Sequence, residues 1–153
     1  RCIKKFLKKN KSKIILEPGR SIIGNTGILI SKVIYNKEGY KKNFIILDAA
    51  MNDLMRPALY NAKHQIKPVV KNNGYTNKVY EFVGPICEST DKFGSYKKFQ
   101  KLREDDLIII CDVGAYGMVL SSNYNLRPKP AEILVSKNSA KIITRRQKLN
   151  NII

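Results

Sequence analysis

The sequence predicts a mainly β fold over residues 24–153, preceded by a short α/β segment over residues 1–23. Two observations lead to this division. Residues 2–9 carry apolar side chains at helical spacing, and the short apolar run 13–16 follows closely, an order typical of α/β folds. After residue 23, short apolar runs alternate with turn-forming residues, as in β domains. A chain of 153 residues, 43% of them hydrophobic, is long enough to bury a core.

The first segment is expected to hold a helix, a turn and a buried strand. Residues 2–9 place apolar side chains on one helical face and lysines on the other, and the last lysines suit the helix dipole. Asn10 to Ser12 is expected to be a turn. Lys13 to Leu16 is expected to be a short strand that neighbouring elements bury.

A compact motif, Glu17-Pro18-Gly19-Arg20, comes directly off this expected strand. Proline ends the strand, and glycine lets a ligand approach the backbone closely. Arg20 carries a fixed fork of donors that suits a carboxylate or a phosphate. A plain turn with a surface arginine explains the same residues, so spacing alone leaves both interpretations open.

Residues 27–48 predict a β-hairpin, because apolar runs flank a turn at residues 36–39. Residues 51–60 are then expected to form a loop or a helical turn. If this segment is helical, Arg56 and Tyr60 face the same side, because they stand four residues apart.

Two strands are expected next. Residues 66–70 are placed at the edge of a sheet, because Pro68 lacks the N–H that a second neighbouring strand needs. Residues 72–74 form a turn, and residues 79–83 form a strand that a Gly-Pro pair breaks. The loop over residues 84–89 therefore begins with a sharp bend.

This loop places the thiol of Cys87 beside the carboxylate of Glu88. A free cysteine is more often a small buried hydrophobe, and a glutamate is often an ordinary solvated charge. The pair by itself therefore indicates a reactive site without establishing one.

The remaining chain is expected to hold one irregular segment and one buried strand. Residues 90–103 are polar and lysine-rich, so we expect them to be irregular. Residues 107–111 predict a strand buried on both faces, with Cys111 in the core. Residues 112–117 form a bend of small residues that carries Tyr116.

The C-terminal residues predict a last pair of strands, 131–135 and 140–143. Thr144 is expected to cap a closing helix over residues 145–151. His64, the only histidine, has no acidic or thiol companion nearby in the sequence, so we expect a structural role for it.

The formal net charge of +17 admits a nucleic-acid partner. The lysines are spread from end to end, however, without an arginine-rich cluster, an aromatic–basic RNA-binding pattern or a helix-turn-helix. Solvated surface charge explains them better, and we expect no nucleic-acid partner.

The sequence also bears on location. Its apolar runs are all shorter than the roughly 18 residues of a membrane span, and its start lacks the features of a secretory signal, so no membrane partner is expected. Three cysteines lie far apart without metal-ligand spacing, which favours free thiols, no metal site and a cytoplasmic setting. The first residue is Arg rather than Met, so we expect a further part upstream.

Several motifs in this order resemble the diaminopimelate decarboxylases, pyridoxal-phosphate enzymes of the alanine-racemase-like fold type. The resemblance covers nearly the whole chain, from about residue 14 to the end. The residues that carry it are Glu17-Pro18-Gly19-Arg20, Met51 to Tyr60, Gly84-Pro85-x-Cys87-Glu88-Ser89, Gly114-Ala115-Tyr116-Gly117, and Ser121-Ser122-Asn123-Tyr124-Asn125-x-Arg127-Pro128.

The resemblance implies a particular architecture. Residues 1–23 would be the last helix and strand of a (β/α)8 cofactor-binding barrel, and residues 24–153 a C-terminal β-barrel or sandwich domain. The lysine that holds the cofactor and the glycine-rich phosphate loop would belong to a part that precedes this chain. These residues alone are therefore not expected to decarboxylate a substrate.

The resemblance also implies roles around pyridoxal 5'-phosphate. Glu17 would face the pyridine nitrogen, and the Pro18-Gly19-Arg20 turn would lie against the cofactor. Tyr116 would bind the phosphate and also face the substrate. Cys87 would return a proton to the α-carbon, a general-acid role that suits a thiol.

For the substrate, the resemblance implies meso-diaminopimelate, whose distal end carries both an ammonium and a carboxylate. Glu88 suits the ammonium, whereas Arg20, Arg56 and Tyr60 suit the carboxylate. Ornithine and arginine decarboxylases share the fold and a related Glu-Pro-Gly-Arg motif, but their substrates have no distal carboxylate. In the family, Cys87 and Glu88 would enter the active site of a second copy, so a homodimer is expected.

Three alternatives remain open from the sequence. One is a related ornithine or arginine decarboxylase, in which Arg56 and Tyr60 would have no distal carboxylate to bind. A small basic nucleic-acid-binding β module would explain the charge but none of the motifs, and a steeply salt-dependent affinity would support it. A truncated remnant without activity of its own would retain the motifs.

Overall fold

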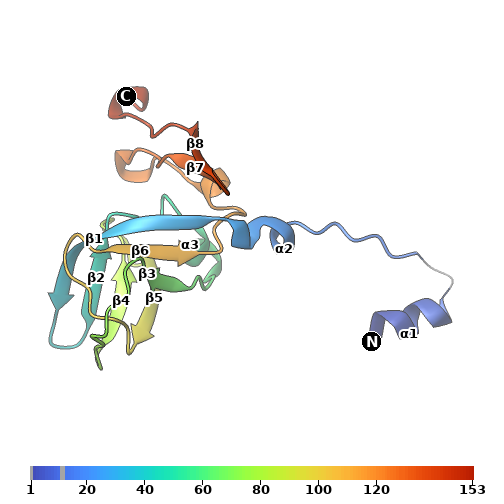
Figure 1. Cartoon of the computed structure of the whole chain (residues 1–153), viewed down its shortest axis with the longest axis horizontal. Coiled ribbons are helices and arrows are strands. Elements are labelled where there is room, and N and C mark those ends of the chain that lie inside the picture. Colours follow the sequence, from blue (N-terminus) through green and yellow to red (C-terminus); the bar gives the residue numbers. More distant parts are fainter. Residues whose placement is uncertain (1, 11–12) are drawn as a thin grey trace.

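The computed structural model describes residues 2–10 and 13–153, and most of their regular structure is β, which confirms the predicted fold class (Figure 1). The helices and strands are α1 (Cys2–Lys9), α2 (Arg20–Ile23), β1 (Ile28–Glu38), β2 (Asn43–Leu47), α3 (Arg56–Tyr60), β3 (Ile66–Pro68), β4 (Val79–Val83), β5 (Lys92–Lys97), β6 (Leu107–Cys111), β7 (Glu132–Ser136) and β8 (Ser139–Thr144). The 3-10 helices are η1 (Gly24–Thr26), η2 (Met118–Leu120), η3 (Tyr124–Leu126) and η4 (Leu149–Asn151).

Six strands form one curled sheet in the order β3-β6-β1-β2-β4-β5. The long strand β1 pairs with β6 through its first half, from Ile28 to Lys32, and with β2 through its second half. A bulge between Val33 and Tyr35 separates the two halves and bends the strand. β1 and β2 are antiparallel neighbours, so the predicted hairpin is confirmed. The turn predicted at residues 36–39 is wrong, because Asn36 to Glu38 pair with β2 inside β1 and the chain turns over residues 39–42, where the Gly39 N–H donates to the Lys42 carbonyl.

The two edge strands of this sheet, β3 and β5, are bridged by a side chain. The Tyr96 hydroxyl on β5 donates to the His64 carbonyl at 2.8 Å and accepts the Ile66 N–H of β3 at 3.1 Å. His64 is buried, and its Nδ1 donates to the Cys111 carbonyl at 2.8 Å. The expected edge position of residues 66–70 is confirmed by β3.

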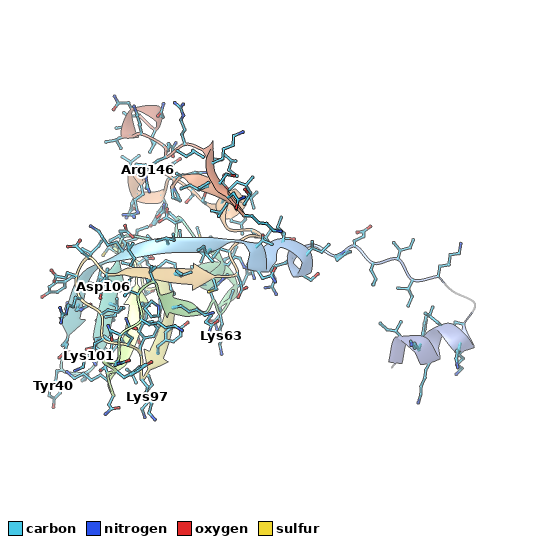
Figure 2. The ribbon with its side chains drawn as sticks, in the orientation of Figure 1. Tyr40, Lys63, Lys97, Lys101, Asp106 and Arg146 are labelled. Carbon is cyan, nitrogen blue, oxygen red and sulfur yellow. The ribbon has the colours of Figure 1, made fainter. Side chains whose placement is uncertain are left out.

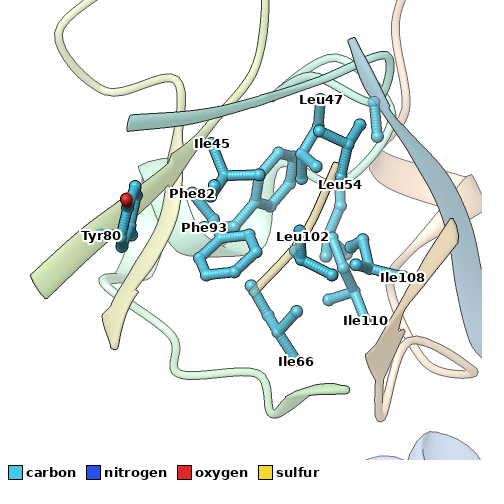
Figure 3. Close-up of a cluster of buried hydrophobic side chains, with 12 residues drawn as sticks. Ile45, Leu47, Leu54, Ile66, Tyr80, Phe82, Phe93, Leu102, Ile108 and Ile110 are labelled. Atoms are coloured by element: carbon cyan, nitrogen blue, oxygen red, sulfur yellow. The ribbon is translucent and has the colours of Figure 1, made fainter. Parts of the chain in front are cut away.

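The core lies inside the curl and is filled by alternate residues of the strands (Figure 3). Phe82 is fully buried and packs edge-to-face against Tyr96 and Phe99, with ring centroids 5.5 and 4.9 Å apart. The buried apolar cluster comprises Val33, Ile45, Leu47, Ala49, Leu54, Ile66, Tyr80, Phe82, Phe93, Leu102, Ile108 and Ile110. This packed frame fixes where the connecting loops emerge.

The N-terminal segment agrees with the sequence only in its helix. Residues 2–9 form α1, as predicted, and Figure 1 shows this helix beyond an extended segment, away from the sheet. The prediction of a buried strand over residues 13–16 is wrong, because these residues pair with no described strand and Ile15 is 85% exposed. A strand is buried by neighbours on its edges and faces, and the described chain supplies none here. Residues 11 and 12 of the expected turn lie outside the described residues.

Two predictions for the second half of the sheet are also wrong. Residues 90–103 are not irregular, because they contain β5, which pairs with β4. The buried Phe93 stands among mostly polar residues of β5, and this polar content hides the strand pattern in the sequence. Residues 107–111 form β6 between β1 and β3, but alternate residues are buried, so only one face is covered. Cys111 is accordingly half-buried rather than a core residue.

The last strands pair as predicted, since β7 and β8 form a separate two-stranded sheet. The closing helix expected over residues 145–151 is wrong, because only η4 forms there. Thr144 ends β8, where its hydroxyl donates to Glu132 at 2.5 Å instead of capping a helix. The cross-strand partner outcompetes the local cap.

Several basic side chains are exposed. Figure 2 shows the labelled Lys97 and Lys101 near the lower end of the sheet, Lys63 after α3 and Arg146 on the C-terminal segment, and all four are exposed. Among the described residues, no helix has both the length and the apolar character needed to cross a bilayer.

Candidate functional site

Gly19, Arg56, Tyr60 and Tyr116, here called the arginine–tyrosine cluster, come together from three separate segments. A Cβ on Gly19 would lie 3.4 Å from the Tyr116 hydroxyl. The Arg56 guanidinium carbon lies 5.8 Å from the ring centroid of Tyr60 and 5.9 Å from that of Tyr116. Arg56 and Tyr60 begin and end α3, so the prediction that they share a side is confirmed.

Close backbone packing brings Tyr116 to this cluster. The Gly114 N–H donates to the Gly24 carbonyl at 2.9 Å, and a Cβ on Gly114 would lie 2.2 Å from the Ile23 carbonyl oxygen. Only glycine allows this approach. Tyr116 itself has a φ of 59°, an uncommon conformation for a residue with a side chain. The strained backbone at Tyr116 therefore orients its side chain toward the cluster.

The cluster offers cationic and phenolic groups to an anion. Arg56 Nε is buried and has no hydrogen-bond partner among the described residues. A buried guanidinium N–H without a partner is costly, which marks a place where an acceptor fits. Arg20, at the start of α2, and Glu17 lie exposed next to Gly19 and supply a further cation and a carboxylate.

Cys87 and Glu88 lie in a second place, the Cys87 loop, defined as residues 84–89. Both side chains are exposed, and Cys87 is a free thiol. The Tyr124 hydroxyl donates to Glu88 Oε1 at 2.6 Å. This hydrogen bond to the carboxylate raises the pKa of Tyr124.

A buried carboxylate, Asp91, holds the Cys87 loop in shape. Asp91 is 3% exposed and accepts the N–H of Ile86 at 2.8 Å and that of Met51 at 2.7 Å. Burial raises the pKa of Asp91, and these two hydrogen bonds oppose the rise. A Cβ on Gly84 would lie 2.3 Å from a carboxylate oxygen, so glycine is required there.

The sequence does not predict that Asp91 holds the Cys87 loop. Asp91 is one acidic residue directly before β5, where a surface charge is the ordinary explanation. Its two partners are 5 and 40 residues away, and the more distant one is visible only in the fold.

Replacing Asp91 by asparagine is expected to lower the free energy of unfolding by about 1–3 kcal/mol. The amide N–H₂ would face a backbone N–H that it cannot accept, in a place that water does not reach. Urea unfolding monitored by fluorescence or circular dichroism measures the change.

The matched control is Asp106→Asn, because Asp106 accepts the Arg103 N–H at 2.7 Å at the surface, where water can replace the lost acceptor. A loss of stability no larger for Asp91→Asn than for this control would contradict the role of Asp91.

A buried polar network explains two other motifs. Arg127 Nε donates to Asn52 Oδ1 at 3.0 Å, and the fully buried Asn52 donates to the Ser122 carbonyl at 3.3 Å. The Arg127 guanidinium also lies 3.8 Å from Asp53, whose pKa is raised by burial. These residues tie the segment before α3 to the one before β7. Their role is structural.

No hydrogen bond or ion pair joins the cluster to Cys87 or Glu88 within the described part of one chain. The structure therefore gathers the predicted site residues into two groups. In both groups most side chains are exposed, whereas Arg56 is half-buried.

Comparison with known proteins identifies the relatives of this arrangement. A family model described as the C-terminal sheet domain of pyridoxal-dependent decarboxylases matches residues 20–114. The diaminopimelate decarboxylase of Aquifex aeolicus is 44% identical over 151 residues, which are 99% of this chain and 36% of that protein. The chain thus spans about a third of the length of the curated relatives it matches.

Solved structures agree with the sequence comparison. The diaminopimelate decarboxylase of M. jannaschii in complex with L-lysine has a TM-score of 0.88 and 38% identity, and the match covers 98% of this chain and 35% of that one. A lysine/ornithine decarboxylase from Vibrio vulnificus, solved with cadaverine, has a TM-score of 0.64 and 21% identity over 74% of this chain and 31% of its own. This second similarity shows the fold alone.

Proposed function

This chain belongs to the pyridoxal-dependent decarboxylases, as their C-terminal sheet domain, and we propose that it is the C-terminal part of a diaminopimelate decarboxylase. The complete enzyme converts meso-2,6-diaminopimelate to L-lysine and carbon dioxide. The observation that carries the proposal is the arginine–tyrosine cluster, in which the Arg56 Nε–H is buried and has no partner in the described part of the chain. A basic amino acid has no distal carboxylate to satisfy it.

The residues next to the cluster fit pyridoxal 5'-phosphate. The Tyr116 hydroxyl and Arg20 are donors suited to a phosphate, and the Glu17 carboxylate suits a protonated ring nitrogen. Pro18 and Gly19 leave the backbone open beside Tyr116, because Gly19 has no side chain. When bound, this cofactor supplies the electron sink for the pair left by the departing carboxylate.

The arginine–tyrosine cluster with Arg20, and the Cys87 loop, act on different parts of the substrate. Arg20, Arg56 and Tyr60 bind the distal carboxylate, and Glu88 binds the distal ammonium, so both charges of the distal centre are paired. Cys87 donates a proton to the α-carbon after decarboxylation. An alternative substrate such as ornithine or arginine leaves Arg56 without its anion, which disfavours that reaction.

Further proposals concern assembly and location. Because Cys87 and Glu88 form no hydrogen bond or ion pair with the cluster in the described part of their own chain, we propose a homodimer in which each Cys87 loop completes the site of the other subunit. The exposed free thiol of Cys87 fits a reducing, cytoplasmic setting. Residues 1–23 are proposed to belong to a (β/α)8 barrel, because Ile15 and Leu16 are 85% and 75% exposed and need a neighbour to cover them.

Expression of this chain together with the reading frame that precedes it tests the proposal. We expect about 250 further residues of alternating strands and helices, and a purified protein that releases carbon dioxide from meso-diaminopimelate but not from ornithine or arginine. Faster release from a basic amino acid would contradict the proposed substrate. No release from any of the three would contradict the proposed activity.

A further inference from the structure

We propose that Tyr124 is a positioning residue that fixes the carboxylate of Glu88 for the distal ammonium of the substrate. This inference rests on the proposed function, because it assigns the ammonium to Glu88. It starts from the hydrogen bond between the Tyr124 hydroxyl and Glu88 Oε1, at 2.6 Å. Tyr124 belongs to none of the roles derived above.

Glu88 gains from such a partner because, among the described residues, no other hydrogen bond restrains its side chain. In the described part of the chain it forms no ion pair, so its negative charge is free for a cation. A free glutamate side chain loses rotamer freedom when it binds a ligand. The hydrogen bond from Tyr124 removes part of this freedom beforehand, and it leaves the remaining lone pairs of the carboxylate for the ammonium.

The backbone around Tyr124 is held in an unusual shape. Asn125 and Leu126, which follow it, have φ values of 56° and 54°, a conformation that costs energy for residues other than glycine. Asn123 closes this bend by donating to the Arg127 carbonyl at 2.8 Å and to Gln147 at 2.6 Å.

The bend is in turn anchored to the molecule through Arg127. Arg127 binds the fully buried Asn52, and Asn52 precedes α3. The same segment before α3 is held by Asp91, which also holds the Cys87 loop. The segments that carry Tyr124 and Glu88 are therefore both hydrogen-bonded to the segment before α3. These hydrogen bonds fix the two residues relative to each other, so the fold itself determines their contact.

The test uses the complete enzyme with Tyr124→Phe, which removes the hydroxyl and keeps the ring. We expect kcat/KM for meso-diaminopimelate to fall about three- to tenfold, mainly through a higher KM, since an exposed hydrogen bond to a charge has a modest effect. Cofactor absorbance should not change. Tyr40→Phe is the matched control, because Tyr40 is fully exposed in the turn after β1, and it should leave all parameters unchanged.

A double-mutant cycle with Glu88→Gln separates positioning from a general structural effect. In the Glu88→Gln background, Tyr124→Phe should change kcat/KM less than twofold, because no carboxylate remains to be positioned. Full additivity of the two substitutions, or no effect of Tyr124→Phe in the wild-type background, overturns this inference alone. A wild-type enzyme that does not decarboxylate meso-diaminopimelate overturns the proposed function and this inference with it.

Discussion

Replacing Cys87 by alanine in the complete enzyme is expected to lower kcat by about 10²- to 10⁴-fold. The thiol is exposed, and Asp91 fixes the loop that carries it through the Ile86 N–H. Alanine keeps the Cβ and the backbone conformation but lacks the thiol, so it has no proton to give to the α-carbon. Steady-state kinetics measure the loss, and titration of the cofactor absorbance should give an unchanged affinity.

The control for this variant is Cys111→Ala, because Cys111 is also a free cysteine but lies half-buried at the end of β6. Its turnover should stay close to that of the wild type. Normal turnover of Cys87→Ala would remove Cys87 from the mechanism, and an equal loss in both variants would point to a general effect of thiol removal.

Replacing Arg56 by alanine is expected to lower kcat/KM for meso-diaminopimelate by about 10- to 100-fold, through a higher KM. The substitution removes the guanidinium that stands between the rings of Tyr60 and Tyr116 and leaves the distal carboxylate of the substrate without its cation. Cofactor absorbance should be retained, because Arg20 and Tyr116 remain.

Arg56→Lys sharpens this test. Lysine keeps the charge but lacks the planar fork, so it should recover only part of the lost affinity. Arg146→Ala serves as the control, since Arg146 is exposed on the segment after β8. An unchanged KM and rate for Arg56→Ala would contradict its role in binding the carboxylate.

Local patterns in the sequence determined much of this protein. The hairpin of β1 and β2, the edge position of β3 and the pair β7 and β8 follow from alternation, turn residues and proline, which act over a few neighbouring residues. The spacing of Arg56 and Tyr60 likewise placed both on one side of α3. The motifs also named in advance the residues that the fold gathers into the arginine–tyrosine cluster and the Cys87 loop.

Only the tertiary structure decided which segments find a neighbouring strand to pair with. Residues 13–16 have the composition of a buried strand, yet they stay exposed because no neighbour in the described chain pairs with them. Residues 92–97 look polar but form β5, because β4 offers a ladder and the core accepts Phe93. Strand formation depends on such partners more than on intrinsic preference.

The long-range hydrogen bonds that hold the candidate site together were also not predictable from the sequence. Asp91 binds Met51 across 40 residues, Arg127 binds Asn52 across 75, and Tyr124 reaches Glu88 across 36. Periodicity and turn chemistry describe only near neighbours, so they carry no record of which distant groups meet. The sequence therefore determined which side chains are candidates for the chemistry, and the tertiary packing decided how they are held and which of them lie together.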